Sequence, residues 1–268
     1  MNIDLCPLCF SEESNDMFDD FENNHYVRCK KCGLTYQNPR KEIEYEEEYW
    51  KVSVDPDGNK RIHADEKEAS LRNEFATEIR YINKMNPGKI LDAGAGYGFF
   101  LSGIDDQWDK HAIELSDYCV KYIKENYPDV NTISEKIEDA TYADNTFDVI
   151  YFYHVIEHVD NPNLVMKNLS RILKPGGLII VSTPNIKSFV AKRFYGNYRL
   201  LGAPHIIMWD KVTLTKVMKL YGIYPYKTLY PYFKTDYFSL KFLLRLFDKD
   251  KISPPFYGNI ITMYARKC

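Results

Sequence analysis

Residues 89–101, KILDAGAGYGFFL, decide the fold of this chain. A short apolar run ends in the acidic residue Asp92, and glycines then follow at every second position, as Gly94, Gly96 and Gly98. Because glycine has no Cβ, such a run lets the backbone turn sharply from a strand into a helix and approach a ligand closely. The following helix would turn its unpaired N–H groups towards that ligand. The stretch therefore predicts a loop that binds a nucleotide-like cofactor.

The spacing of the glycines indicates which cofactor the loop takes. Dinucleotide loops have the pattern G-x-G-x-x-G, with the pyrophosphate at the positive end of a helix. This chain has G-x-G-x-G instead, and Asp92 stands two residues before the first glycine. A carboxylate repels phosphates, whereas it attracts the ammonium group of an amino-acid moiety. The loop therefore favours S-adenosylmethionine over NAD.

The pattern D-x-G-x-G-x-G resembles motif I of the class I S-adenosylmethionine-dependent methyltransferases. Glu114 ends the next apolar stretch and stands where that family has its ribose-binding acid, and residues 137–139 stand where the family flanks the adenine. The run LKPGG at 173–177 resembles the turn into the family's fifth strand. A surface-loop acid would explain Glu138 equally well. The resemblance implies that the cofactor is bound by Asp92, Gly94, Gly96, Gly98, Glu114, Ile137, Glu138 and His154.

Strand and helix patterns alternate along the centre of the chain, which predicts a doubly wound parallel sheet. We expect strands near residues 89–93, 110–114, 130–133, 147–153 and 177–183. We expect helices near 97–106, 116–126 and 161–173, preceded by one near 66–85. A helix near 211–221 and strands near 223–232 and 257–267 would complete a seven-stranded Rossmann-like sheet, with the last strand inserted antiparallel. Such sheets bind ligands beyond the carboxyl ends of their strands, so Asp92, Glu114 and His154 should converge there.

The first forty residues carry two C-x-x-C pairs separated by nineteen residues, which is the spacing of a zinc ribbon. Four thiolates close a tetrahedral zinc site, so we expect a structural zinc rather than a catalytic one. We therefore divide the chain into a ribbon (1–40), a linker (41–65) and a methyltransferase domain (66–268). The ribbon resembles those attached to bacterial methyltransferases of surface-glycan and secondary-metabolite sugars. Its zinc ligands would be Cys6, Cys9, Cys29 and Cys32.

The fourth strand runs into residues 154–159, HVIEHV, in which His154, Glu157 and His158 share one helical face. The run resembles the E-x-x-E-H element of the ubiquinone-pathway O-methyltransferases and the plant small-RNA 2′-O-methyltransferases, where carboxylates and histidine hold a divalent metal. His154 replaces the first Glu, which would suit Zn²⁺, Fe²⁺ or Mn²⁺ better than Mg²⁺. His205 is a candidate further ligand.

Three roles for this element stay open. It holds a metal, or one histidine is a general base with Glu157 orienting it, or the residues only shape the turn. Between metal and base the sequence favours the base, with His158 as the residue and Glu157 holding its tautomer.

The residues after the fifth strand suggest an anionic acceptor. Lys187 and the other basic residues of that segment could hold a diphosphate, or they could form a solvated loop. The aromatic insert near 233–256, with Phe233, Tyr237, Phe238, Phe242 and Phe247, favours core packing or a homodimer contact over a substrate wall. We expect O-methylation of a nucleotide-activated sugar or surface-glycan precursor. The expected acceptor-binding residues are His205, Lys192, Arg193 and Arg199.

Composition limits the alternatives. The 268 residues are 45% hydrophobic and 27% charged, with a net charge of −3, as in ordinary globular proteins and unlike non-specific nucleic-acid binders. No apolar run is long enough to span a bilayer and the N-terminus does not resemble a signal peptide, so we expect a cytoplasmic protein with reduced cysteines. Two other functions stay open, an RNA methyltransferase whose ribbon binds RNA and a non-enzymatic adaptor with a vestigial cofactor fold.

Overall fold

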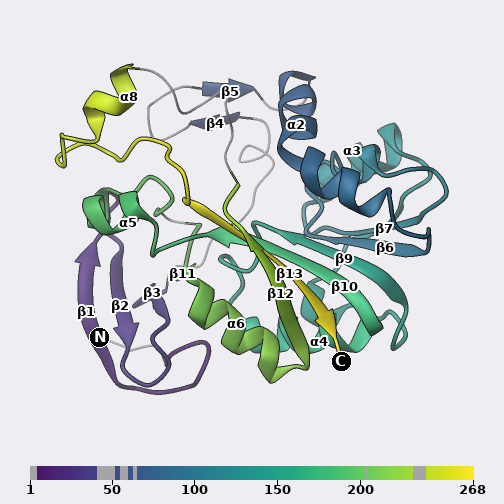
Figure 1. Cartoon of the computed structure of the whole chain (residues 1–268), viewed down its shortest axis with the longest axis horizontal. Helices are drawn as coiled ribbons and strands as arrows, with labels where there is room; N and C mark the ends of the chain where they lie inside the picture. The colour runs from purple at the N-terminus through teal and green to yellow at the C-terminus, as the bar shows by residue number, and fades with distance from the viewer. Residues whose placement is uncertain (1–4, 41–51, 55–59, 63–64, 203, 232–239) are drawn as a thin grey trace. The chain divides into compact units, whose positions relative to one another are not determined.

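The computed structural model describes residues 5–40, 52–54, 60–62, 65–202, 204–231 and 240–268 (Figure 1). The chain divides into two compact units, which we describe separately. We call them the ribbon unit and the cofactor unit. The ribbon unit comprises Met1–Ile43, His154–Met166 and Val181–Ala265, and the cofactor unit comprises Glu44–Tyr153, Lys167–Ile180 and Arg266–Cys268.

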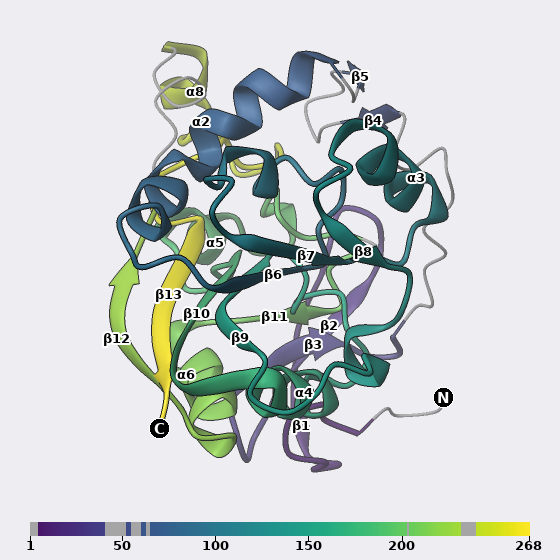
Figure 2. The same ribbon diagram turned by 90° about the vertical axis from the view of Figure 1, so that its right-hand side faces the viewer.

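The predicted seven-stranded sheet is confirmed. Its strand order is β12 (Ile223–Leu229), β13 (Ile260–Lys267), β10 (Leu173–Pro184), β9 (Phe147–Tyr153), β6 (Lys89–Ala93), β7 (Asp109–Ile113), β8 (Asn131–Ile133). β6 pairs in parallel with both β7 and β9, and β7 pairs in parallel with β8. Figure 2 shows β6, β7 and β8 side by side. The last strand of the chain, β13, lies between β12 and β10, as the inserted seventh strand should.

Three of the helices predicted around the parallel strands lie close to their predicted positions. α2 (Asp65–Ile82) buries Phe75 and Ile82, and the Phe75 ring lies edge-on to the rings of Phe100 and Tyr151. α3 (Asp117–Asn126) begins at Ser116, whose hydroxyl accepts from the Cys119 N–H, and it turns three apolar side chains into the core. α4 (Pro162–Ile172) precedes β10. Burial of these apolar faces holds the helices on the sheet.

The helix predicted near residues 97–106 is wrong. The segment forms turns and one short 3₁₀ helix, η1 (Leu101–Gly103). Glycine has the lowest helix propensity after proline, and Gly98 has φ of 76°, outside the helical region. Gly103 also lies so close to α2 that a Cβ there would meet Ile79 Cδ1 at 2.5 Å. Tight packing, rather than helix formation, shapes this segment.

The ribbon unit contains a second, four-stranded sheet (Figure 1). β1 (Ser14–Asp19), β2 (His25–Cys29) and β3 (Thr35–Gln37) pair antiparallel in chain order. The fourth strand, β11 (Ile207–Met208), comes from far along the chain and pairs antiparallel with β3. The sequence did not predict this strand, because two residues carry no periodicity.

The remaining elements of the described chain are short. They are β4 (Val52–Val54) and β5 (Lys60–Ile62), which pair antiparallel, η2 (Ile137–Asp139), α5 (Phe189–Phe194), η3 (Tyr195–Asn197), α6 (Lys211–Leu220) and α8 (Leu240–Arg245). Most of the expected linker and three residues of the aromatic insert (Phe233, Tyr237 and Phe238) lie outside the described residues. Of the other two, Phe242 is half-buried and Phe247 is exposed. Among the described helices, none is long and apolar enough to cross a membrane.

Candidate functional site

The glycine loop has the backbone geometry that its sequence requires. Gly94, Gly96 and Gly98 have φ of 85°, 52° and 76°, in the left-handed region that favours glycine. The Gly94 N–H donates to the Ile113 carbonyl at 2.8 Å, which ties the loop to the end of β7. A Cβ on Gly98 would meet Ile123 Cγ1 at 3.0 Å, so the loop also packs closely on α3.

Two buried carboxylates flank this loop. Asp92 in β6 is 3% exposed and Glu114, just after β7, is 6% exposed. The Glu114 carboxylate accepts from the Gly96 N–H and the Ser116 N–H, each at 2.8 Å. Burial raises the pKa of both carboxyls, and the charge of Glu114 raises the pKa of Asp92 further. Among the residues that the structure describes, no basic side chain pairs with either acid, so the pair favours a positively charged ligand.

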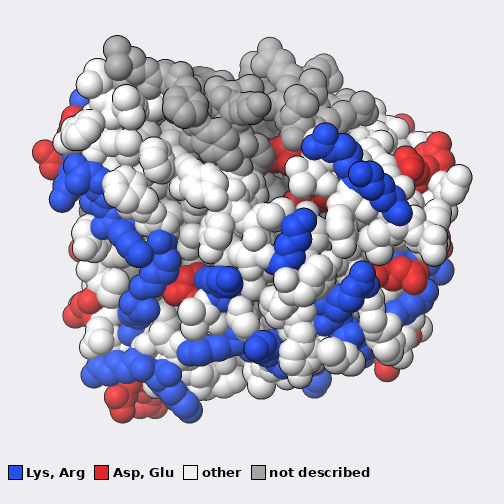
Figure 3. Space-filling view, in the orientation of Figure 1, with Lys and Arg blue, Asp and Glu red and all other residues white. Residues whose placement is uncertain are grey.

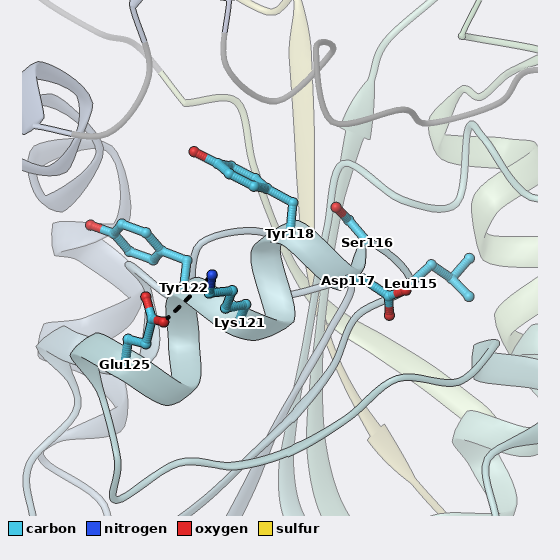
Figure 4. A pocket seen from close by; sticks show the side chains of 7 residues that line it. All are labelled: Leu115, Ser116, Asp117, Tyr118, Lys121, Tyr122 and Glu125. Atoms are coloured by element: carbon cyan, nitrogen blue, oxygen red, sulfur yellow. Dashed lines mark ion pairs between the residues drawn. The ribbon is translucent and has the colours of Figure 1, made fainter.

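A hollow of ≈620 Å³ opens along α3 and the two residues that follow Glu114 (Figure 4). Tyr118 and Tyr122 stand on one side of it, and both rings lie edge-on to Tyr97 of the glycine loop. Lys121 and Glu125 form an ion pair at 3.9 Å on the same helix. The lining consists of Leu115, Ser116, Asp117, Tyr118, Lys121, Tyr122 and Glu125. Aromatic faces and hydroxyls next to a glycine loop suit a ligand with both an apolar and a polar part.

The segment predicted to flank an adenine forms η2 and belongs to the same unit. Its first residue, Ile137, is buried, and its carbonyl accepts from Asn168 Nδ2 at 2.5 Å. The same Asn168 nitrogen donates to the Ala140 carbonyl at 3.3 Å, so both ends of the turn are tied to α4. Glu138 is half-buried between them. The adenine contact of Ile137 and Glu138 stays a prediction.

The four ribbon cysteines come together as the sequence predicts. Their sulfur atoms all lie within 4.8 Å of one another, with Sγ–Sγ distances of 3.5 Å for Cys6 and Cys32 and 3.4 Å for Cys9 and Cys29. Four thiolates at about 2.3 Å from one zinc lie roughly 3.8 Å apart, so the cage is close to the right size. Burial raises the pKa of Cys29, but hydrogen bonds from the Cys32 N–H and the Cys9 thiol lower it to about 7. The cluster therefore fits one zinc ion.

His154 and Glu157 form a buried pair in the ribbon unit. His154 has φ of 53°, a strained value for a histidine, and its Nδ1 lies 2.9 Å from Glu157 Oε1. Glu157 is fully buried, and its Oε2 accepts from the Thr183 hydroxyl at 2.9 Å. Burial alone would raise the pKa of Glu157, but the hydrogen bond and charge of His154 lower it to about 2. Glu157 is therefore ionised at neutral pH.

His158 and His205 lie next to Glu157, with their ring centroids 4.9 Å apart. His158 Nδ1 donates to the Pro204 carbonyl at 2.6 Å, and His205 Nδ1 donates to the Leu200 carbonyl at 2.7 Å. This tautomer presents the Nε2 lone pair of each ring as a ligand or proton acceptor. Burial lowers the pKa of His158, and it lowers that of His205 to about 4.

The resulting cluster differs from the expected one. Ligand atoms of Glu157, His158 and His205 lie within 4.8 Å of one another, whereas His154 serves as the hydrogen-bond partner of Glu157. The tautomer of His158, which we expected Glu157 to hold, is held by the Pro204 carbonyl. Sequence reasoning had no signal for such a backbone partner, because any residue can supply it.

The basic residues after β10 have different roles. Lys187 and Lys192 are exposed, whereas Arg193 Nε donates to the Leu246 carbonyl at 2.6 Å. Partial burial lowers the pKa of Lys187, and the charges of Arg28 and Lys192 lower it further. The charge of Arg28 in β2 therefore acts on Lys187, as does the opposing charge of Asp210, and sequence spacing could not reveal either. Arg199 is half-buried, and its backbone N–H donates to Ser253 Oγ at 3.0 Å. Figure 3 shows Lys and Arg side chains on the left of the view, where β1 and α5 lie in Figure 1, and further ones across the centre and right.

Comparisons with known proteins identify the family of this chain. Residues 62–227, more than half of the chain, match the family described as "Methyltransferase domain". A ubiquinone biosynthesis O-methyltransferase of Rickettsia bellii is 34% identical over 110 residues, covering 39% of this chain and 45% of the relative. Phosphoethanolamine N-methyltransferase 1 of Arabidopsis thaliana is 31% identical over 118 residues, covering 40% of this chain and 23% of the relative. The chain thus spans less than half the length of these relatives.

A solved structure supports the same fold. The structure of an S-adenosylmethionine-dependent methyltransferase from Thermotoga maritima superposes with a TM-score of 0.53 at 20% identity, covering 76% of this chain and 95% of that chain. The expected resemblance to class I methyltransferases is confirmed at the level of family and fold. The chain belongs to the methyltransferase domain family and has the seven-stranded Rossmann-like fold of its S-adenosylmethionine-dependent members.

Proposed function

We propose that this protein binds S-adenosylmethionine in the cofactor unit and transfers its methyl group to an oxygen of a small anionic acceptor. The observation that carries the proposal is the pair of buried acids, Asp92 and Glu114, beside a loop of three left-handed glycines. S-adenosylmethionine carries an ammonium and a sulfonium group. Either group could serve as the cationic partner of the two carboxylates. Its ribose hydroxyls could donate to the Glu114 carboxylate, as the family resemblance implies.

The chain's own contribution to the reaction is mainly positioning. When bound, S-adenosylmethionine supplies a methyl group on a sulfonium, which leaves as a neutral thioether. Methyl transfer then requires an in-line approach of the acceptor oxygen. The glycine loop approaches the cofactor closely and positions it. The hollow beside Tyr118 and Tyr122 offers aromatic surface and hydroxyls for the rest of the cofactor. A hydroxyl acceptor must also lose a proton, which a base or a metal must promote.

We propose that a divalent metal at Glu157, His158 and His205 promotes that proton loss. Metal-bound histidines commonly donate their other ring N–H to a carbonyl, and both rings do so here. The two imidazoles with lowered pKa values stay neutral, as ligands must, and Glu157 is ionised. Two nitrogens and one oxygen suit Zn²⁺, Fe²⁺ or Mn²⁺ better than Mg²⁺. Burial lowers the pKa of His158, which makes it a weaker general base, so we prefer the metal to the base that the sequence favoured.

The charge of the ribbon unit supports an anionic acceptor. Between residues 181 and 227 the sequence has eight Lys and Arg residues against one acidic residue, Asp210. Lys187, Lys192 and Arg28 cluster within this unit and could hold a diphosphate. A nucleotide-activated sugar or another glycan precursor has this chemistry. We propose that class of acceptor, and a structural zinc on the four cysteines.

Isothermal calorimetry with S-adenosylhomocysteine tests the cofactor part of the proposal. We expect one binding site per chain, and we expect Asp92→Asn and Glu114→Gln to weaken the affinity. A matched control is Asp129→Asn, because Asp129 pairs with Lys110 elsewhere in the same unit. Wild-type protein that binds no S-adenosylhomocysteine would overturn the proposal. Transfer of label from methyl-labelled S-adenosylmethionine to a panel of sugar nucleotides then tests the acceptor class.

A further inference from the structure

We infer that the ribbon positions the proposed metal site, with Tyr26 and Gln37 as positioning residues that hold the loop carrying His205. The inference rests on the metal site of the proposed function, Glu157 with His158 and His205. It assigns the ribbon a second role besides binding zinc. All of the residues that carry the argument belong to the ribbon unit.

The backbone of the ribbon reaches the metal site through β11. In this strand Ile207 pairs with Tyr36 of β3, and the Gln37 N–H donates to the Ile206 carbonyl at 2.9 Å. The Ile207 N–H donates to the Glu157 carbonyl at 3.0 Å. One short strand is therefore bonded both to the ribbon sheet and to the backbone of a proposed metal ligand.

Two buried side chains of the ribbon hold the loop just before this strand. The Tyr26 hydroxyl donates to the His205 carbonyl at 2.8 Å. Gln37 Nε2 donates to the Tyr26 oxygen at 3.1 Å and to the Gly202 carbonyl at 3.3 Å. Both side chains are fully buried, so water cannot replace the bonds they make. These contacts hold the backbone carbonyls of Gly202 and His205.

Backbone carbonyls before and after Gly202 set the orientation of both proposed histidine ligands. The Leu200 carbonyl accepts from His205 Nδ1, and the Pro204 carbonyl accepts from His158 Nδ1. A shift of the loop would therefore turn two of the three ligands away from a common point. Such partners of metal-bound histidines commonly change metal affinity by roughly 10- to 100-fold when removed.

The zinc cage adjoins the strands that make these contacts. Cys29 ends β2, and its N–H donates to the Leu34 carbonyl at 2.9 Å, next to the start of β3. Asn163 Nδ2 donates to the carbonyls of Pro7 and Leu8 at 2.9 and 3.1 Å, so the first cysteine pair is tied to the segment that follows His158. Release of zinc should therefore loosen the second metal site as well.

The test is a cobalt titration of the full chain with zinc on the ribbon. Cobalt in a site of two imidazoles and a carboxylate gives weak visible bands, whereas cobalt on four thiolates adds intense near-ultraviolet bands, so the sites are distinguishable. We expect Tyr26→Phe and Gln37→Leu to keep one zinc per chain and to bind cobalt about 10- to 100-fold more weakly than wild type. S-adenosylhomocysteine affinity should not change.

Tyr142→Phe is the matched control, because Tyr142 is a half-buried tyrosine hydrogen-bonded to His111 in the cofactor unit. It should bind cobalt as wild type does. Wild-type cobalt affinity in Tyr26→Phe, which removes only a hydroxyl, would overturn the inference even if Gln37→Leu fails to fold. A wild-type protein that takes metal only on its cysteines would also overturn it. Failure to bind S-adenosylhomocysteine would contradict the proposed cofactor site. It would not contradict the positioning role, which the cobalt titration tests separately.

Discussion

The two candidate sites of this protein are assembled in different ways. The cofactor site draws its acids and glycines from residues 92–114, in two neighbouring parallel strands and the loop between them. The metal site combines the segment after β9, a loop after β10 and two ribbon strands near the N-terminus. The first site depends on local backbone geometry, whereas the second depends on hydrogen bonds between distant segments.

Gly96→Arg should abolish S-adenosylhomocysteine binding. Gly96 has φ of 52°, which strains any residue with a Cβ, and a long cationic side chain would fill the place of the ligand. Calorimetry measures the loss. The zinc content of the variant should stay at the wild-type value, because the ribbon belongs to the other unit. Unaltered binding in Gly96→Arg would exclude this loop as the cofactor site.

Cys29→Ser should release the ribbon zinc. Three thiolates no longer close the tetrahedral site, and a metal that binds only the folded state stabilises that state. Metal analysis and limited proteolysis of residues 1–40 measure the effect. The cofactor unit should still bind S-adenosylhomocysteine. Carefully purified wild-type protein that contains no zinc would refute the zinc ribbon.

Chelation at a concentration that spares the ribbon zinc should abolish methyl transfer while S-adenosylhomocysteine affinity stays nearly constant. The metal would lower the pKa of the acceptor hydroxyl, so its loss acts on turnover rather than on cofactor binding. Added Mn²⁺ or Fe²⁺ should restore activity. If His158 is instead a general base, chelation should have no effect and His158→Ala should lower kcat by roughly 10²- to 10⁴-fold.

Asp92→Asn should stabilise the ligand-free protein while it weakens cofactor binding. The folded state raises the pKa of Asp92, so ionisation at neutral pH opposes folding, and stability falls as pH rises above the unfolded pKa. Asparagine cannot ionise, so the variant avoids the cost of burying a charge at this position. Each kcal/mol gained in the free energy of unfolding should raise the Tm by roughly 2–4 °C. Affinity for S-adenosylmethionine should rise with pH in the wild type, because the acid must be ionised to attract a cation. A Tm that falls in Asp92→Asn would contradict this account.

Lys187→Ala should have the smallest effect. An exposed ion pair contributes about 0.2–1 kcal/mol, so the KM for an anionic acceptor should rise by no more than roughly fivefold. The effect should shrink at high salt, because exposed charges are screened. Lys89→Ala, which removes an exposed cation that pairs with Asp109 in the cofactor unit, serves as the control. Equal KM changes in the two variants would argue against the basic cluster as the acceptor site.

Expectations based on local pattern agree well with the structure. Strand β6 covers the predicted residues 89–93, and β9 covers the predicted 147–153. The prediction of a helix near 97–106 was wrong. A pattern of apolar residues does not indicate how closely Gly98 and Gly103 pack on their neighbours. Local propensity is a weak guide where tertiary contacts decide the backbone.

Local sequence patterns were enough to predict the glycine loop and the clustered cysteines. Three glycines after an acid predict a loop with positive φ values, and two C-x-x-C pairs predict a cluster of four cysteines, because each feature is recognised from residue types at fixed spacing. Which residues surround Glu157 depends on the folded chain. His205 joins His158 there, and Tyr26 with Gln37 holds the His205 loop, because β11 pairs with a ribbon strand far away in the sequence. A two-residue strand and backbone carbonyl partners leave no pattern of residue types, so only the folded chain specifies them.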